Sequence, residues 1–440
     1  MLQKFYTRLA NEYNSYSAPE KFFIICMMMC SFAITAEAAI TRAVANSVFL
    51  SAYTAKFFPT VWLISVPINL SIVTFYNRFL PKFGCAKILS LFMCIAICIN
   101  LFCAFYLSSI SWLPLLLYLW KDIFIILIFQ QLWSVCHATV NISRAKYLYG
   151  FFVGIGGCGS VIGSLVSGLF AVELGTEKLL LTTIPIYLTV TIFYCFALFV
   201  REKIPTRQDI STMSHDSTDI WGGMKLIRHS KFLIFILLVV LSMQVATNLM
   251  DYQFSLYLEK VFSVQDLRTE FLGWFFGVVN MLNIGLQFFG GFLLVHLLGL
   301  QKAHFLLPMF LSINCLGFLL FPSFPMMCLS FGTIKALDYS IFAIIKEMLY
   351  IPLKVEEKFK AKAIIDVFAH RSSKAIASIF ILILQWFTLV HLESFISLGL
   401  LIIFICWMIS VMFMFKYYYH ELNRQHINWP ESQITESRYE

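Results

Sequence analysis

Charged side chains occur inside long apolar stretches of this chain, each stretch long enough to cross a lipid bilayer. They are Glu37, Arg42, Lys121, Asp122, Asp251, Lys335, Asp338, Lys346, Glu347, Arg371 and Lys374. A charge at the bilayer centre costs about 2.5–3.5 kcal/mol even on lenient insertion scales, so such side chains either pair with one another or face water inside the protein. Lys335 and Asp338 could form such a pair, because they lie three residues apart on one helix face. For the whole set we favour a water-filled pathway, because the charges recur on separate apolar stretches.

A row of polar residues adds to these charges. Gln244, Asn248, Asp251 and Ser255 follow one another at spacings of four, three and four, which places them on one helix face. We expect this face to contact protein or water rather than lipid. His370 next to Arg371 could carry a proton near neutral pH, or it could simply be solvated at the membrane surface.

A polar helix–loop–helix segment, which we call the corner, occurs twice in the sequence. The segment 346–374 reads KEMLYIPLKVEEKFKAKAIIDVFAHRSSK, and its Lys362 follows Lys146 by 216 residues. The same offset of 216 separates Asp338 from Asp122 and Glu347 from Gln131. Related halves of this kind are common in secondary transporters. We expect Lys146, Lys362 and Asp366 to be structural residues of the two corners.

The composition indicates a polytopic, all-α membrane protein. Hydrophobic residues make up 60% of the 440 residues and charged residues only 13%, with a mean hydropathy of +0.81, whereas soluble proteins carry about 25% charged residues. At about 20 residues per span, the polar breaks predict about twelve transmembrane helices. Their expected bounds are 22–44, 57–76, 87–107, 113–136, 149–172, 179–200, 232–258, 270–294, 304–321, 325–352, 364–391 and 394–415.

These helices divide into two sets of six. We predict a cytoplasmic N-terminus over 1–21, a first six-helix bundle over 22–200, a cytoplasmic linker over 201–231, a second bundle over 232–415 and a cytoplasmic tail over 416–440. Lysine and arginine concentrate in the loops that share a side with the linker, which places both termini in the cytoplasm. A six-plus-six arrangement with a repeated half is similar to the major-facilitator transporters, whose cavity lies between the two halves.

Several motif-like patterns have simpler explanations. Gly154, Gly156 and Gly159 satisfy a dinucleotide-binding pattern on paper, but no strand or soluble sheet surrounds them, so we expect close helix packing. The twelve cysteines form no zinc-like set, and the sequence contains no HExxH, GxSxG or Walker motif. We therefore expect neither an enzyme nor a metal or cofactor site. The net charge of +8 lies in short loops, which argues against nucleic-acid binding.

The corner at Lys346 resembles that of a known family. KEMLYIPL followed by KFKAKAIIDV is similar to the KEMAYIPLD and KVKGKAAIDVV of the ATP/ADP carriers of intracellular bacteria and plastids. Weaker matches follow in chain order along the whole sequence: Arg42 of the family's RDTKD, Ala145-Lys146 of its EAKRFYPLFG, Asn248-Leu249-Met250-Asp251 of its NLVE, and Phe271-Leu272-Gly273 of its FMG.

The resemblance implies an exchanger of nucleotides in a bacterial cytoplasmic membrane, as a divergent, shorter family member. Its substrate pathway would include Arg42, Asp251, Lys346, Arg371 and Lys374, with the basic residues facing phosphates. Together with the charges of the repeat, the expected pathway residues are Arg42, Lys121, Asp122, Asp251, Asp338, Lys346, Glu347, Arg371 and Lys374. The expected partners are a small molecule, a nucleotide by this resemblance, and the lipid bilayer, with a monomer favoured.

The chain departs from the family at several charged positions, three of which affect lysines or exchange the sign of a charge. Ala45 stands where the family has a lysine, Lys121 where it has a glutamate, and Asp338 where it has a lysine. The pathway is therefore close to neutral. This keeps open a proton-coupled transporter of another small polar metabolite, in which desolvated Asp122, Asp251 and Asp338 would exchange protons. A membrane scaffold without transport is a third hypothesis. Lys121 and Asp338 could also pair with each other instead of lining a cavity.

Overall fold

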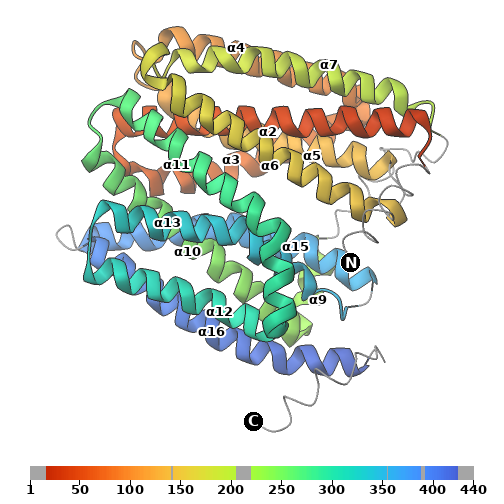
Figure 1. Ribbon diagram of the computed structural model, residues 1–440, viewed down its shortest axis with the longest axis vertical. Coiled ribbons are helices and arrows are strands. Elements are labelled where there is room, and N and C mark those ends of the chain that lie inside the picture. Colours follow the sequence, from red (N-terminus) through yellow and green to blue (C-terminus); the bar gives the residue numbers. More distant parts are fainter. Residues whose placement is uncertain (1–15, 140–141, 205–219, 354, 388–391, 425–440) are drawn as a thin grey trace. The chain divides into compact units, whose positions relative to one another are not determined.

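The computed structural model describes residues 16–139, 142–204, 220–353, 355–387 and 392–424 (Figure 1). Within these ranges every regular element is helical. Twelve of the described helical segments are long and apolar enough to span a membrane, which confirms the predicted all-α, polytopic architecture.

The first half of the chain forms six spans close to their predicted positions. Its helices are α2 (Ala18–Tyr53), the 3-10 turn η1 (Ala55–Phe57), α3 (Phe58–Phe83), α4 (Cys85–Tyr106), α5 (Leu113–Thr139), α6 (Ile142–Leu174), the 3-10 turn η2 (Lys178–Thr182) and α7 (Thr183–Arg201). The longest is α2, which begins with a capping box: the Ser17 hydroxyl accepts the Glu20 N–H, and Glu20 accepts the Ser17 N–H.

The second half contains elements that the sequence did not reveal. Its helices are α9 (Ile220–His229), α10 (Lys231–Val261), α11 (Gln265–Gly285), the π-helix η3 (Leu286–Gly290), α12 (Gly291–Leu320), α13 (Phe324–Leu337), the π-helix η4 (Asp338–Phe342), α14 (Ala343–Met348), α15 (Val355–Phe387) and α16 (Leu392–Arg424). The short helix α9 lies within the linker that we expected to be polar loop, and it packs on α15.

Two glycines make sharp turns between spans. Gly84 separates α3 from α4 with φ of 77°, and Gly299 interrupts α12 with φ of 78°. Positive φ is readily accessible only to glycine, so these residues end one helix and allow the next to start in a new direction. The break between the eighth and ninth predicted spans accordingly falls at Gly299, inside α12.

Contacts group the chain into two compact units. Unit 1 comprises residues 1–218, 251–286 and 327–336, and unit 2 comprises 219–250, 287–326 and 337–440. Unit 1 thus contains the predicted first bundle, the whole of α11 and parts of α10 and α13. The bundle boundaries drawn from the sequence remain a prediction.

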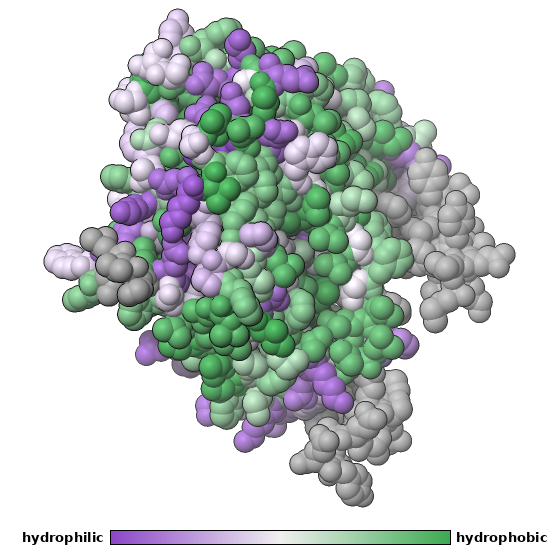
Figure 2. All heavy atoms as spheres, turned by 60° about the vertical axis from the view of Figure 1, so that its left-hand side comes forward, coloured by the Kyte–Doolittle hydropathy of each residue, from purple (hydrophilic) through white to green (hydrophobic). Residues whose placement is uncertain are grey.

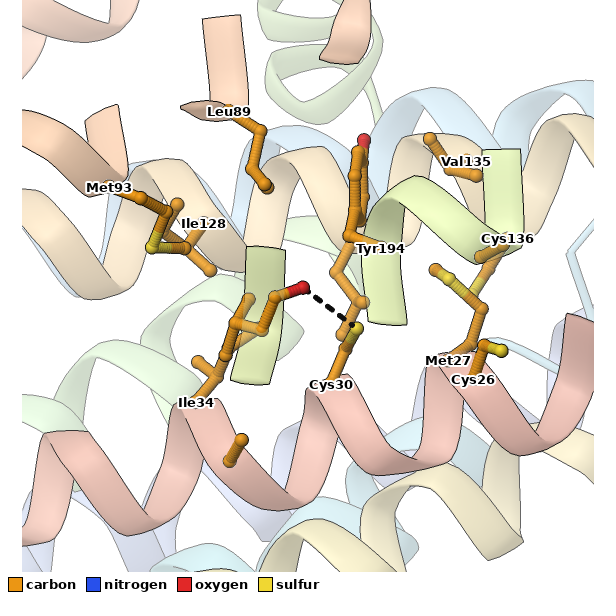
Figure 3. Close-up of a cluster of buried hydrophobic side chains, with 14 of the residues drawn as sticks. Cys26, Met27, Cys30, Ile34, Leu89, Met93, Ile128, Val135, Cys136 and Tyr194 are labelled. Carbon is orange, nitrogen blue, oxygen red and sulfur yellow. Dashed lines mark hydrogen bonds between the residues drawn. The ribbon is translucent and has the colours of Figure 1, made fainter. Parts of the chain in front are cut away.

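Apolar packing in unit 1 joins α2, α4, α5 and α7. Figure 3 shows Cys30 and Ile34 of α2 facing Met93 of α4 and Tyr194 of α7, with the Cys30 thiol 3.7 Å from the Val190 carbonyl oxygen. Cys30 is fully buried, as expected of a small apolar packing residue. This core fixes the position of α2, which carries two of the in-span charges.

Three helices of unit 1 approach closely at glycines, as the sequence predicted. A Cβ added to Gly159 or Gly163 of α6 would overlap the backbone of α2 at Phe32 or Ala36. A Cβ on Gly273 of α11 would overlap the backbone of α6 at Gly168. These close approaches confirm that the glycine pattern serves helix packing in lipid.

The surface is strongly apolar. Figure 2 shows large continuous areas of hydrophobic side chains on the face that it presents. Across the described residues, exposed apolar side chains include Phe75, Phe105, Met281, Phe289, Leu320, Trp386 and Phe387. A soluble monomer rarely exposes so much contiguous apolar surface, whereas a protein surrounded by lipid requires it.

Candidate functional site

Arg42 is a partly buried cation in the middle of α2. Its guanidinium carbon lies 5.8 Å from the ring centroid of Phe276 on α11, within the range of a cation–π interaction. No described carboxylate forms an ion pair with it. Its hydrogen-bond donors can therefore bind an anion in addition to the ring contact.

Lys121 on α5 contacts both a carboxylate and an aromatic ring. Its Nζ lies 3.3 Å from Oδ1 of Asp122 and 4.1 Å from the ring centroid of Tyr118. The Tyr118 hydroxyl accepts a hydrogen bond from the Trp62 indole at 2.6 Å, which fixes this ring. The charge of Lys121 is thus compensated within its own unit.

Asp251 and Lys335 form the second ion pair of unit 1. Lys335 Nζ on α13 lies 3.6 Å from Oδ2 of Asp251 on α10, and 5.3 Å from the ring of Phe331. Phe331 stacks on Phe254 of α10 at 4.3 Å between centroids, and this contact holds the two helices together. This pair joins residues far apart in the chain. The pair of Lys335 with Asp338, which their short spacing suggested, stays a prediction.

In unit 2, Asp338 belongs to a chain of polar side chains. The Gln244 amide on α10 donates to Oδ1 and Oδ2 of Asp338, at 3.0 and 3.3 Å. The Oε1 of the same amide lies 3.1 Å from Nδ1 of His370 on α15. Gln244 therefore links a buried carboxylate to an exposed histidine, and both groups can carry protons.

The polar row on α10 contacts protein, as predicted. Besides the contacts of Gln244 and Asp251, the Asn248 amide donates to the Ser373 hydroxyl of α15 at 3.1 Å. Ser255 donates to the carbonyl of Asp251 one turn earlier. The face therefore supplies two of the charged or polar clusters described above.

Asp338 also begins an irregular stretch of helix. Residues 338–342 form the π-helix η4, and the second π-helix, η3, contains Gln287, whose amide donates to the Tyr339 carbonyl at 2.7 Å. π-Segments are rare and occur frequently at functional sites, because they interrupt the regular hydrogen bonds of the helix. The amide of Gln287 satisfies one carbonyl in this interrupted region.

The corner after α14 contains two ion pairs. Lys346 Nζ lies 2.8 Å from Asp366 Oδ1, and Lys362 Nζ lies 2.7 Å from Glu347 Oε2. Both pairs join α14 to α15 across the turn. Of the expected corner residues, Lys362 and Asp366 thus have structural contacts, whereas the side chain of Lys146 on α6 lies outside the described part of the chain.

Tyr350 lies in the same corner and is completely buried. Burial first, and then the nearby carboxylates of Asp366 and Glu347, raise the pKa of the Tyr350 phenol. The phenol is therefore neutral at physiological pH and acts here as a packing residue.

Arg371 on α15 differs from the neighbouring lysines. It is partly buried, and no described residue forms a hydrogen bond or an ion pair with its side chain. Lys374 follows on the same helix, and its carbonyl accepts a hydrogen bond from Ser378. Arg371 in unit 2 therefore matches Arg42 in unit 1 as an arginine without a carboxylate partner.

The sequence did not reveal the aromatic partners of these cations. Tyr118 and Phe331 precede Lys121 and Lys335 by three and four residues, a spacing that places each ring on the face of its lysine. That spacing could have identified both rings. Phe276 could not have been found this way, because its partner Arg42 lies on a different helix.

Two family models match the chain. The model described as the TLC ATP/ADP transporter matches residues 326–418, and that of the Major Facilitator Superfamily matches residues 134–345. The first of these ranges contains the corner with Lys346, Glu347, Lys362, Asp366, Arg371 and Lys374.

Several solved transporter structures share the fold at low sequence identity. The nucleoside transporter NupG has a TM-score of 0.61 and 11% identity, and the match covers 89% of this chain and 100% of that one. A bacterial homologue of the iron transporter ferroportin, in an inward-facing state, gives the same four values. A bacterial homologue of the human lysosomal transporter Spinster, inward-facing and unoccupied, has a TM-score of 0.57 and 10% identity, with 93% and 98% covered.

Proposed function

We propose that this membrane transporter, which has the major-facilitator fold and a segment similar to the ATP/ADP carriers, exchanges nucleotides across the membrane by alternating access. The family match covers the corner whose residues first suggested this relationship. The substrate is a small molecule, and we propose a nucleotide on the basis of that match.

The proposal rests on a difference in ion pairing between the lysines and the arginines. Within the described residues, Lys121, Lys335 and Lys346 each have a carboxylate partner. Arg42 and Arg371 are partly buried and have none. An arginine can hold two phosphate oxygens at once through its planar fork of donors. We therefore assign phosphate binding to Arg42 and Arg371.

Aromatic side chains in unit 1 suit the rest of a nucleotide. Tyr118 and Phe276 lie beside Lys121 and Arg42, so a cation and a ring occur together at two places. A nucleotide presents both an anion and a flat base, and bases stack on aromatic rings. Because Lys121 is already paired with Asp122, we assign this role to Arg42 and Phe276.

Alternating access requires contacts that break during the cycle, and unit 1 contains a set that fits this role. The Thr176 N–H donates to Asp266 at 2.8 Å, Arg268 donates to the Ser47 carbonyl at 3.0 Å, and Ser47 donates to the Gln265 carbonyl at 2.8 Å. We call these five residues the outer clasp, because the distribution of lysine and arginine predicts that this end of the helices lies outside the cell. The clasp joins α2, the end of α6 and the start of α11.

Three residues of the clasp are buried: Ser47, Thr176 and Arg268 are 0%, 1% and 3% exposed. Gln265 and Asp266 are partly exposed. Next to the clasp, burial first, and then the Asp266 carboxylate, raise the pKa of Glu177. A largely buried, hydrogen-bonded contact between these helices supports a conformation that is closed on the predicted outer side. Both termini would lie in the cytoplasm, and the bilayer would be the cytoplasmic membrane of a bacterium.

Counterflow in proteoliposomes tests the proposal. Purified protein would be reconstituted with and without ADP inside the vesicles, and uptake of labelled ATP would be measured. We expect ADP loading to stimulate uptake severalfold. Folded protein that gives no nucleotide-stimulated uptake of any labelled nucleotide, but that binds another solute, would rule out nucleotide exchange.

A second candidate function is proton-coupled transport of another small polar metabolite. The linked side chains of Asp338, Gln244 and His370 favour it, because they connect two protonatable groups within unit 2. Uptake that depends on a proton gradient, stops with an uncoupler and is lost in Asp338→Asn would support this candidate. Uptake driven only by substrate on the opposite side would exclude it.

A further inference from the structure

A carboxyl group is buried in unit 1 away from the charges described above. Glu37 of α2 is 2% exposed. Its Oε1 accepts hydrogen bonds from the Thr41 hydroxyl at 2.5 Å and from the Tyr187 hydroxyl of α7 at 2.6 Å. The Asn100 amide of α4 extends this network, donating to the Tyr187 hydroxyl and the Thr183 hydroxyl at 2.8 Å each.

The second carboxyl oxygen of Glu37 is buried as well. Oε2 has no hydrogen-bond partner among the described groups, and no described cation forms an ion pair with Glu37. The groups that face it are Thr41 on its own helix, Tyr187 from α7 and, one step further, Asn100 from α4. Tyr187 is the one titratable group among them, and the described parts of α5 and α6 provide no hydrogen bond or ion pair to the carboxyl.

The two carboxyl oxygens of Glu37 differ in their hydrogen bonds, as expected of a protonated and therefore neutral carboxylic acid. Two hydroxyl donors converge on Oε1, whereas Oε2 lacks the hydrogen bonds that a buried anionic oxygen requires. An isolated carboxylate in an apolar interior is so unfavourable that the group takes up a proton instead. Oε2 is the atom that can carry that proton without losing an existing hydrogen bond.

We propose that Glu37 is a proton-binding site, occupied in the conformation described here, and that release of its proton is coupled to movement of α2. A glutamine would fill the same space and would stay neutral, so packing alone does not require an acid here. Because an ionisable residue inside a membrane is costly, such residues usually have a function.

Glu37 and Arg42 lie on the same helix, and this couples proton release to the position of Arg42. Arg42 follows it by five residues, so its side chain is rotated by about 140° around the helix axis, where it lies over Phe276 of α11. One face of α2 therefore contacts α7 through Glu37, and another carries the proposed phosphate ligand. A charge on Glu37 would disturb the first face and thereby move the second.

Infrared spectroscopy tests proton binding without any substrate. Spectra of the purified protein would be recorded during a pH titration. We expect a carbonyl band of a protonated carboxylic acid that shifts in deuterium oxide, disappears at high pH and is absent from Glu37→Gln. Asp122→Asn is the control, because Asp122 is paired with Lys121 and should not contribute to this band. Identical difference spectra for the wild type and Glu37→Gln would overturn the proposal.

Tyr187→Phe provides a second variant that keeps the acid. It removes one hydrogen bond to Oε1, so we expect the carbonyl band to remain but to move to higher frequency. An unmoved band would show that the observed acid is not Glu37. A Glu37-dependent rise in melting temperature with sodium, and no acid band, would show that the site binds a metal cation and would overturn proton binding.

Proton binding is independent of the proposed function, whereas coupling to transport rests on that function. Where nucleotide exchange is measurable, we expect its rate to change over the pH range in which the band titrates, and this dependence to vanish in Glu37→Gln. A pH dependence unchanged in Glu37→Gln would refute coupling. If no exchange occurs at all, the infrared result still decides proton binding.

Discussion

At the scale of single residues, ion pairing separates the basic side chains of the proposed pathway and of the corner into two groups. Lys121, Lys335, Lys346 and Lys362 each lie beside a carboxylate of the same unit. Arg42 and Arg371 have no such partner among the described residues. Each unit therefore contains one arginine without a carboxylate partner, alongside lysines whose charge is largely compensated.

We expect Arg371→Gln to reduce ATP/ADP exchange at least tenfold at low nucleotide concentration, because it removes a bidentate phosphate ligand. Arg371→Lys should restore only part of the activity, since an ammonium group lacks the planar fork. Both variants would be measured by counterflow. Arg228→Gln is the control, because Arg228 is exposed on α9. Equal loss in Arg228→Gln would show that the effect is not specific to the pathway.

The two ion pairs of the corner should differ in their effect on stability. In the pair of Lys346 with Asp366 the side chains are 17% and 34% exposed, compared with 38% and 44% for Lys362 with Glu347. Exposed pairs contribute about 0.2–1 kcal/mol because water screens them. We expect Asp366→Asn to lower the melting temperature in detergent more than Glu347→Gln does. The reverse order would show that the corner is stabilised by other contacts.

At the scale of helices, close approach at glycine shapes unit 1. Gly163 of α6 lies against the backbone of Ala36, whereas the nearest atoms to a Cβ on Gly277 of α11 would be 3.7 Å away, an ordinary contact distance. Both glycines lie inside long helices. The difference between them is the space available.

We therefore expect Gly163→Ala to destabilise the protein by about 1–3 kcal/mol, because α2 and α6 must move apart. Gly277→Ala should be neutral or slightly stabilising, since alanine favours a helix and has room. Thermal unfolding of both variants in the same detergent would test this difference. Similar melting temperatures would mean that α2 can adjust at no cost.

Most helices could be predicted from the sequence because lipid imposes long apolar stretches, and these are easy to recognise. The exceptions have local causes. Helix α9 is too short and polar to give that signal, and the irregular segments η3 and η4 share the apolar composition of ordinary helix. The turn at Gly299 lies within the break predicted between the eighth and ninth spans, but hydropathy could not show that the helix continues on both sides of it as α12.

At the scale of the whole molecule, the charged residues were predictable but their partners were not. Lys335 with Asp251, and Asp338 with Gln244, are contacts between residues far apart in the chain. Hydrophobic periodicity gives the face on which a residue lies and not the helix that the face meets. The pair of Lys346 with Asp366 was easier to anticipate from the sequence, because the two residues lie on either side of one short turn.

The outer clasp yields a prediction about the transport cycle. The hydroxyls of Thr176 and Thr269 lie 2.9 Å apart. We expect the double variant Thr176→Cys, Thr269→Cys to form a disulfide under oxidation, to lose exchange and to recover it after reduction. Each single cysteine variant is a control for the native thiols. Cross-linked protein that still exchanges at the wild-type rate would show that the clasp does not open during transport.

The π-helix at Asp338 limits how far the two halves of the chain can be treated as copies. Asp122 and Gln131 lie on one uninterrupted α-helix, whereas the matching Asp338 and Glu347 are separated by η4. Equal spacing in sequence therefore gives unequal rotation about the helix axis. Gln131 donates to the Cys85 carbonyl, while Glu347 pairs with Lys362. The internal symmetry of the sequence is thus broken at Asp338, and roles can be transferred between the halves only up to that residue.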